Sequence, residues 1–250
     1  MQDYSVPVLT EISENPSAKF RLMGRSQPTA MKTLTTLLGK NASFFLPFLL
    51  WIVGGALLQA FFTHEELFLA INHAHAPWAD VVMTGITYIG DGITFAIMLA
   101  VILALRKYKL FLSAGAILLL VTIIVQVAKH YYNEPRPILY FADTSALVHT
   151  VKWVSVHGSC SFPSGHTTTA FAMFTFLTLI CGNKFSGFAF LTLALLAAYS
   201  RIYLAQHFFV DVYAGSIIGT TSSLVIYTLF HQRRMKSSPE VDAEPVIGLT

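Results

Sequence analysis

Charged residues are scarce in this 250-residue chain: only 12% are Asp, Glu, Lys or Arg, whereas 54% are hydrophobic. Soluble domains are roughly 45–50% apolar even when glycine is counted, so the composition excludes an ordinary soluble domain. The chain also has no glycine-rich nucleotide-binding loop, no internal repeat and no basic stripe interleaved with aromatic residues. Without such a stripe, the net charge of +3 does not indicate a nucleic-acid partner.

The chain contains several long apolar runs. Each is about 20 residues long, enough for a helix to cross a hydrocarbon core of about 30 Å. The six runs are 44–62, 81–105, 110–128, 166–182, 185–203 and 209–230. We therefore expect an all-α membrane protein, with a six-helix domain at 44–230 between tails at 1–43 and 231–250. The first run starts too late and is too long for a secretory signal.

The second run is the least regular of the six. Its continuous apolar part, Ile93 to Leu105, is too short to cross a bilayer alone. The span must therefore include Asp80 to Ile89, which places Gly90-Asp91-Gly92 inside it. We expect a kinked helix here, with Asp91 near one membrane interface.

Cysteine is also rare, and its two residues should lie far apart. Cys160 falls in the polar segment before the fourth run, and Cys181 lies near the far end of that run. A disulfide needs Cα atoms within about 7 Å of each other. An internal disulfide is therefore not expected.

Lysine and arginine predict the orientation in the membrane. Twelve of the 16 lie before the first run, after the sixth, or in the two connections that share their side. Because basic residues collect on the cytoplasmic side, both tails should be cytoplasmic and the protein multi-pass in the inner (plasma) membrane. The four exceptions on the periplasmic side are Lys129, Arg136, Lys152 and Arg201.

The first polar segment on that side runs from Lys129 to Arg136. Pro135 and Pro137 bracket the arginine and favour an extended backbone around it. Arginine binds phosphate oxygens in pairs, and lysine can act beside it as a point charge. The alternative is that both cations only extend toward lipid headgroups, which is common at helix ends.

The second segment is Pro163-Ser164-Gly165-His166, immediately before the fourth run. Proline and serine are typical of a helix start, and a helix N-terminus is a ready anion site. Gly165 would let the backbone approach a phosphate closely, with His166 in the first helical turn. A plain capping turn with an interfacial histidine is the alternative.

The third segment starts at Ser200-Arg201 and ends with His207 and Asp211. A spacing of four places His207 and Asp211 on one helix face. There the carboxylate can hold one ring nitrogen and leave the other free as a nucleophile. A neutral histidine hydrogen-bonded within the bundle is the alternative.

Together the three segments match Lys-x6-Arg-Pro, Pro-Ser-Gly-His and Ser-Arg-x5-His-x3-Asp at every position. In this the chain resembles the type 2 phosphatidic acid phosphatase and haloperoxidase superfamily, and the Asn133-to-Pro137 turn is similar to its bacterial phosphatidylglycerophosphatase B branch. The resemblance implies the helical core of acid phosphatases and vanadium haloperoxidases, and hydrolysis of lipid phosphates without a metal or other cofactor. It assigns His207 as the nucleophile, Asp211 as its orienting group and His166 as the general acid. The phosphate-binding residues it implies are Lys129, Arg136, Ser164, Gly165 and Arg201.

The expected partners are a lipid phosphate substrate and the bilayer, and the expected oligomeric state is a monomer or weak homodimer. One alternative function is transfer of phosphate from lipid to lipid; another, of a different class, is a transporter or lipid-binding protein. Transporters typically have paired broken helices and repeats, which the sequence does not show clearly. His64, His73 and His75 fit no tight metal-ligand spacing, and an interfacial amphipathic helix is the preferred interpretation of their segment.

Overall fold

The computed structural model describes residues 30–143 and 147–235, and within these ranges every regular element is helical. The helices are α2 (Ala30–Lys40), α3 (Ala42–Phe61), α4 (His64–Asn72), α5 (Pro77–Thr87), the 3-10 turn η1 (Tyr88–Gly90), α6 (Gly92–Ala104), α7 (Tyr108–Tyr132), α8 (Pro137–Tyr140), α9 (Gly165–Cys181), α10 (Lys184–Tyr203) and α11 (Phe209–Met235). Helix α2 occupies part of the segment expected to be a tail. The rest of that tail and the end of the C-terminal one, 1–29 and 236–250, lie outside the described residues.

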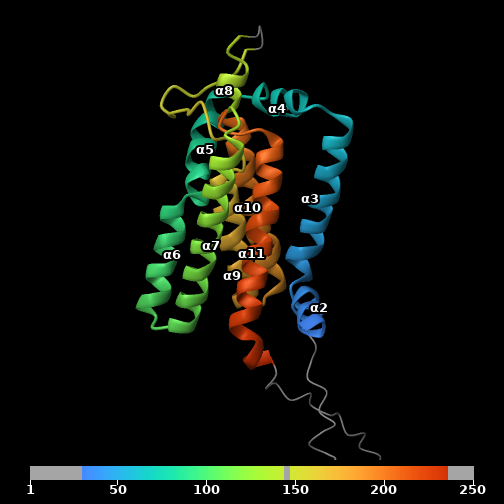
Figure 1. Ribbon diagram of the computed structural model, residues 1–250, viewed down its shortest axis with the longest axis vertical. Helices are drawn as coiled ribbons and strands as arrows, with labels where there is room; N and C mark the ends of the chain where they lie inside the picture. The colour runs from blue at the N-terminus through green and yellow to red at the C-terminus, as the bar shows by residue number, and fades with distance from the viewer. Residues whose placement is uncertain (1–29, 144–146, 236–250) are drawn as a thin grey trace, which may run out of the picture.

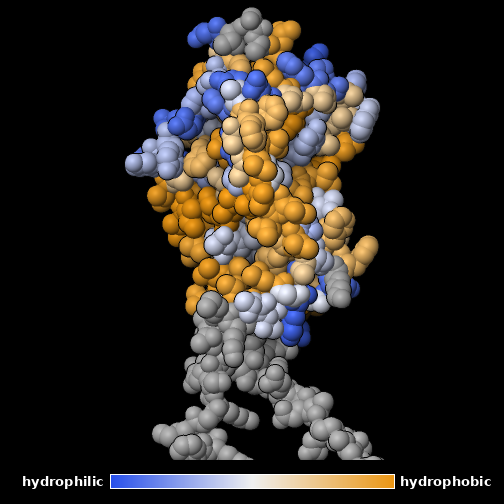
Figure 2. Space-filling model, turned by 90° about the vertical axis from the view of Figure 1, so that its right-hand side faces the viewer, coloured by the Kyte–Doolittle hydropathy of each residue, from blue (hydrophilic) through white to orange (hydrophobic). Residues whose placement is uncertain are grey.

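Helix α9 lies at the centre of the bundle, with α7, α10 and α11 packed against it (Figure 1). Most of its residues are buried, and Phe171 and Phe176 are fully enclosed. Helix α3 lies at the edge and exposes Leu50 and Val53. Apolar side chains cover the middle of the face in Figure 2, while polar ones gather toward the end that carries α4 and α8.

Four segments are long and apolar enough to cross a membrane: Ala42–Phe61, Tyr108–Tyr140, Phe185–Tyr203 and Phe209–His231. A fifth candidate is the pair Pro77–Gly90 and Gly92–Ala104, which is bent by 50°. Helix α9 is apolar but has only 17 residues, about 26 Å at 1.5 Å per residue. The helix positions agree with the six apolar runs, but the expected count of six spans is not confirmed, because α9 is short.

The bend in the second run falls where the sequence predicted it. The Asp91 side chain caps α6 by accepting a hydrogen bond from the Ile93 N–H at 3.0 Å. Gly90 lies against α9, and a Cβ on it would come within 2.7 Å of the His166 carbonyl oxygen. The Gly90 side of the break therefore packs against the start of α9, and broken backbone is tolerated in a membrane where it is buried in protein.

Helix α4 lies across the end of the bundle and joins an aromatic cluster there (Figure 1). The ring of Phe208 packs against His64, Phe68, Tyr140 and Phe141, with centroid separations of 5.2 to 6.2 Å. Such contacts favour edge-on and tilted geometries. The cluster fixes the chain just before α11 begins.

The segment 147–164 covers the same end and is anchored at several points. Asn72 donates from Nδ2 to the carbonyl oxygens of His149 and Tyr203, and its Oδ1 accepts from the His149 N–H. His149 in turn lies 2.9 Å from Asp80 Oδ1. Because these bonds join the segment directly to α4 and α5, and through Asn72 to α10, it forms a fixed cover rather than a loose loop.

Small residues set the separation of α9 and α11. A Cβ at Gly219 would lie 2.3 Å from the carbonyl oxygen of Thr168 and 2.8 Å from the Ala172 nitrogen, both of them backbone atoms. A Cβ at Gly215 would lie 2.9 Å from the Ser164 carbonyl oxygen. Gly215 and Gly219 therefore allow α9 and α11 to pack closely within the chain.

We predict that Gly219→Ala destabilises the protein by about 1–3 kcal/mol, since backbone atoms cannot move away from an added methyl group cheaply. Thermal unfolding in detergent should show a lower transition temperature. Gly115→Ala in α7 is the control, because nothing lies within 4 Å of its Cβ position. That change should be neutral or stabilising, and equal losses in both variants would contradict the packing argument.

Candidate active site

A tight turn between α10 and α11 carries His207. The chain reverses through Ala205, whose φ of 55° lies in the left-handed region. The N–H groups of Gln206 and His207 both donate to the Arg201 carbonyl oxygen, at 2.9 and 3.2 Å. The turn places His207 beneath the covering segment with only 1% of its surface exposed.

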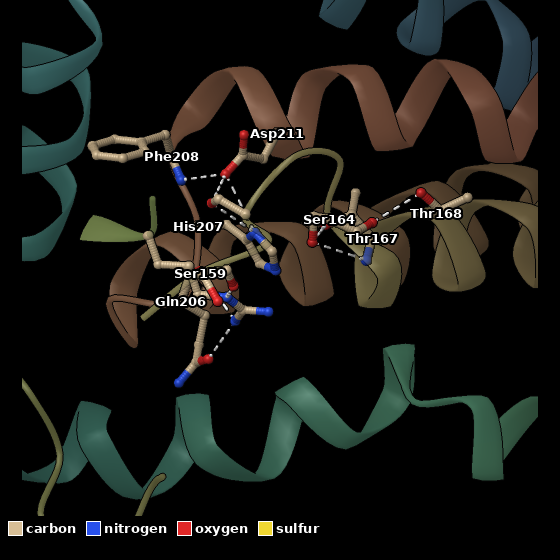
Figure 3. A network of polar contacts seen from close by, with 10 residues as sticks. Ser159, Ser164, Thr167, Thr168, Gln206, His207, Phe208 and Asp211 are labelled. Carbon is tan, nitrogen blue, oxygen red and sulfur yellow. Dashed lines mark hydrogen bonds and ion pairs between the residues drawn. The ribbon is translucent and has the colours of Figure 1, made fainter. Parts of the chain in front are cut away.

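Asp211 holds the imidazole through one nitrogen. Its Oδ2 lies 3.3 Å from His207 Nδ1 and accepts hydrogen bonds from the Phe208 N–H and the Ser161 hydroxyl (Figure 3). Ser161 Oγ also lies 3.4 Å from His207 Nδ1. The bond from Phe208 is half of a capping box, which fixes the carboxylate at the start of α11. Nε2 is then the ring nitrogen left for chemistry.

Burial sets the charge state of His207. Desolvation lowers the pKa of His207 to about 3, although the hydrogen bond to Asp211 opposes that change. Buried imidazole titrates low because the low-dielectric interior disfavours its cation. At neutral pH the ring therefore carries a lone pair on Nε2 when Nδ1 holds the proton.

Arg136 is fixed by neutral oxygen atoms. Its Nε donates to the Ser159 carbonyl oxygen at 3.0 Å, and its Nη1 donates to Gln206 Oε1 at 3.0 Å. The Arg136 backbone N–H donates to the Gly158 carbonyl oxygen at 2.8 Å. Gln206 is tied in turn to the Ser155 carbonyl oxygen. Carbonyl acceptors hold a guanidinium without neutralising it, so its charge remains available to a ligand.

Arg201 lies deeper, at the end of α10. Its Nη1 donates to Thr87 Oγ1 at 2.6 Å, while its Nε is buried without a hydrogen-bond partner among the described residues. A buried donor without a hydrogen-bond partner is energetically costly. This nitrogen is therefore a candidate donor to an acceptor on a bound ligand. Lys129, in the last turn of α7, is near enough to interact electrostatically with Arg136, Arg201 and Asp211.

Ser164 begins α9 as the sequence predicted. Its Oγ accepts from the Thr167 N–H at 3.4 Å and from the Thr167 hydroxyl at 3.0 Å. Its own N–H donates to the Asp211 carbonyl oxygen, which joins the start of α9 to that of α11. Gly165 packs near Val125, and His166 Nε2 lies 3.7 Å from Asp91 Oδ2.

The fold thus brings the three sequence segments to one end of the bundle. His166 interacts electrostatically with Arg201, Lys129 and Arg136, and His207 interacts with two of the same cations. Like charges held this close in a dry site repel each other. Binding of an anion would relieve that repulsion, and the unpaired Arg201 Nε supplies a donor for it.

Four residues of the site were not predicted from the sequence. Ser161 contacts both members of the His207–Asp211 pair, Gln206 holds Arg136, Thr87 holds Arg201, and Asp91 faces His166. Of these, Gln206 had a signal, because it directly precedes the nucleophile candidate. The other three become visible only when distant segments are packed together.

A cavity of about 830 Å³ lies beside the His207–Asp211 pair. Its lining is mostly apolar, with Phe62, Leu67 and Phe209 among its walls, and it reaches Ser161 and Asp211. Within 30–143 and 147–235, no group of three or more His, Cys, Asp or Glu side chains is placed to hold a metal ion. Cys160 and Cys181 are both free.

The sequence pattern of the PAP2 superfamily matches residues 110–235, which is half of the chain and holds all three motif segments. The chain belongs to the PAP2 superfamily. It is accordingly a phosphoric ester hydrolase, and the resemblance seen in the motifs is confirmed.

Relatives with assigned activities support this placement. The chain is 31% identical over 183 residues to the lipid A 4'-phosphatase of Porphyromonas gingivalis, covering 69% of this chain and 75% of the relative. It is 30% identical over 157 residues to phosphatidylglycerophosphatase B of Bacillus subtilis, covering 57% and 71%.

Solved structures agree with the sequence relatives. Aquifex aeolicus LpxE superposes with a TM-score of 0.57 at 32% identity, covering 65% of this chain and 93% of that one. A transmembrane PAP2-type phosphatidylglycerolphosphate phosphatase from Bacillus subtilis gives a TM-score of 0.53 at 25% identity, covering 77% and 96%. The helical fold is therefore that of PAP2 membrane phosphatases.

We predict that Ser161→Ala lowers the rate of phosphate release by roughly tenfold, because losing one hydrogen bond of about 1.4 kcal/mol loosens the His207–Asp211 pair. Ser161→Thr should keep much of the rate, since it retains a hydroxyl. Ser159→Ala is the matched control: Ser159 contacts Arg136 through its backbone carbonyl. An unchanged rate for Ser161→Ala would show that the hydroxyl does not position the pair.

Proposed function

We propose that this protein is a membrane lipid phosphatase that removes phosphate from a lipid mono- or diphosphate through a phosphohistidine on His207. The observation that carries this proposal is the placement of Arg136 and Arg201 near the buried, neutral His207, with Lys129 close to both cations. Relatives named for lipid A, phosphatidylglycerophosphate and undecaprenyl diphosphate support a lipid phosphate as the substrate. Phosphatidate is a further candidate.

In the first step, His207 Nε2 attacks phosphorus while the bond from phosphorus to the lipid oxygen breaks. Asp211 and Ser161 hold Nδ1, so the ring stays oriented and its developing positive charge is stabilised. His166 donates a proton to the departing oxygen. The three cations, Ser164 and the Gly165 amide bind the phosphoryl oxygens, whose charge must be stabilised in the transition state.

In the second step, water attacks the phosphorus of phosphohistidine. His166, now neutral, accepts a proton from this water, and the bond from phosphorus to Nε2 breaks. Inorganic phosphate leaves, and His207 and His166 return to their starting states. For a monoester substrate the products are the lipid alcohol and phosphate, so atoms and charges balance over the cycle.

We further propose six membrane crossings, with α9 as the fourth. About 17 residues is the lower limit for a transmembrane helix, and α9 lies inside the bundle, shielded from lipid by its neighbours. Six crossings place both ends on one side, and the basic residues favour the cytoplasm for that side. The active site then faces the periplasmic side of the inner membrane.

The apolar cavity beside Asp211 supports sideways entry of the substrate. Its walls include the ends of α3, α4, α7 and α11, and it reaches Asp211. A hydrocarbon chain would lie there while its phosphate extends past Asp211 toward the cations. This arrangement would let a lipid react without leaving the bilayer.

We predict that His207→Ala abolishes phosphate release and phosphohistidine formation, because no other group takes the place of Nε2. Purified protein in mixed micelles should be tested with a panel of lipid phosphates and diphosphates, using radiolabelled phosphate to trap the intermediate. Thermal unfolding should confirm that the variant is folded. Turnover near that of the wild type would overturn the nucleophile assignment.

We also predict that chelators leave activity unchanged, since cationic side chains surround the phosphate. Phosphate release should be measured before and after incubation with EDTA, followed by dialysis into metal-free buffer. A large loss that returns on adding a divalent metal would contradict the proposed mechanism.

A further inference from the structure

The break between α5 and α6 brings a second carboxylate into the active site. Asp91 Oδ2 lies 3.7 Å from His166 Nε2, and both side chains are about one-third exposed. Asp91 lies outside residues 110–235, the part matched by the PAP2 superfamily. Nothing in the three motif segments therefore accounts for it.

The two oxygens of Asp91 have different neighbours. Oδ1 accepts a hydrogen bond from the Ile93 N–H and caps α6. Oδ2 is the oxygen that faces His166. Helix capping alone explains the first contact but needs no charge, since asparagine caps helices as well as aspartate does. The negative charge of Asp91 matters for the second contact, with His166.

The charged groups around His166 explain what the negative charge of Asp91 can do there. The charged groups that face it are Arg201 from α10, Lys129 from α7, Arg136 from the loop before α8, and Asp91. Three of these four are positive and oppose a further positive charge on the ring, yet a general acid must carry its proton before it can donate it. Asp91 is the group among them that favours the protonated ring.

The position of Asp91 is fixed by the packing of the break. Gly90 lies against the His166 backbone, where a Cβ would come within 2.7 Å of the carbonyl oxygen. On the other side, Thr87 accepts the hydrogen bond from Arg201. The break is therefore joined to two active-site residues and cannot move away from His166 independently.

We propose that Asp91 is a positioning residue for the proton donor: it orients His166 and offsets part of the positive charge around it, as Asp211 orients His207. This inference rests on the proposed phosphatase mechanism. The chain would then use two carboxylate–histidine pairs, one for the nucleophile and one for the proton donor. Asp91 does not touch the substrate, so its effect should depend on how much the leaving group needs a proton.

The test is Asp91→Asn, which keeps the capping oxygen and removes the charge. For a lipid phosphate, whose alkoxide needs protonation, kcat/KM should fall at least tenfold at the alkaline end of the pH profile. The alkaline limb should move to lower pH by about one unit, the scale of a single close charge. For p-nitrophenyl phosphate, whose leaving group needs no proton, the change should be under about threefold.

Asp143→Asn is the matched control, because it removes an exposed carboxylate elsewhere at the same end of the molecule. Asp91→Glu should restore part of the alkaline limb. If Asp91→Asn does not accumulate, Asp91→Ser also keeps a capping oxygen without charge and takes its place.

Two failures can be told apart. An unshifted limb, or equal losses on both substrates, would overturn the role of Asp91 while leaving an active wild-type phosphatase. A wild type that releases no phosphate from any lipid phosphate would instead overturn the proposed function itself.

Discussion

Mutual repulsion among three buried or half-buried cations is the constraint on which this site depends. Lys129, Arg136 and Arg201 lie at one end of a bundle that is otherwise poor in charge. The fold does not neutralise them in pairs. It holds Arg136 by carbonyl and amide oxygens and Arg201 by a threonine hydroxyl, so the positive charge is ordered but not cancelled. Ordered, uncancelled charge is what a phosphoryl group in transfer requires.

The covering segment contributes to this arrangement throughout its length. Its backbone carbonyls hold Arg136 and Gln206, and its Ser161 hydroxyl reaches the His207–Asp211 pair. The same segment is hydrogen-bonded to the Asn72 side chain on α4. The geometry of the His207–Asp211 pair is therefore coupled to the outer surface of the bundle through short, direct contacts.

Much of this architecture could be predicted from the sequence, because the apolar runs and the motif spacings are local features of the chain. Apolar runs located every long helix to within a few residues, and the kink at Gly90-Asp91-Gly92 followed from one run that was too short. Motif spacing predicted that His207 and Asp211 share a helix face, which is wrong, because His207 lies in the turn before α11; their side chains nevertheless meet, with Nδ1 of His207 3.3 Å from Oδ2 of Asp211. The helix at α2 was missed, because its segment was assigned to a polar tail.

The supporting residues could not be predicted in the same way. Thr87 and Arg201 are 114 positions apart, and Ser161 and Asp211 are 50 apart. No periodicity or spacing rule connects such pairs, since their contact depends on how whole helices pack.

The glycine contact between α9 and α11 has a consequence for how this enzyme can diversify. His166 lies in the first turn of one of these helices and Asp211 in that of the other, and at Gly215 and Gly219 the backbone of α11 approaches the backbone of α9 without an intervening Cβ. The spacing between the starts of these two helices is therefore fixed by their own packing and is insensitive to which lipid is the substrate. Selection for a new lipid can then act on the rim and the cavity walls, while the width of the reacting centre stays constant.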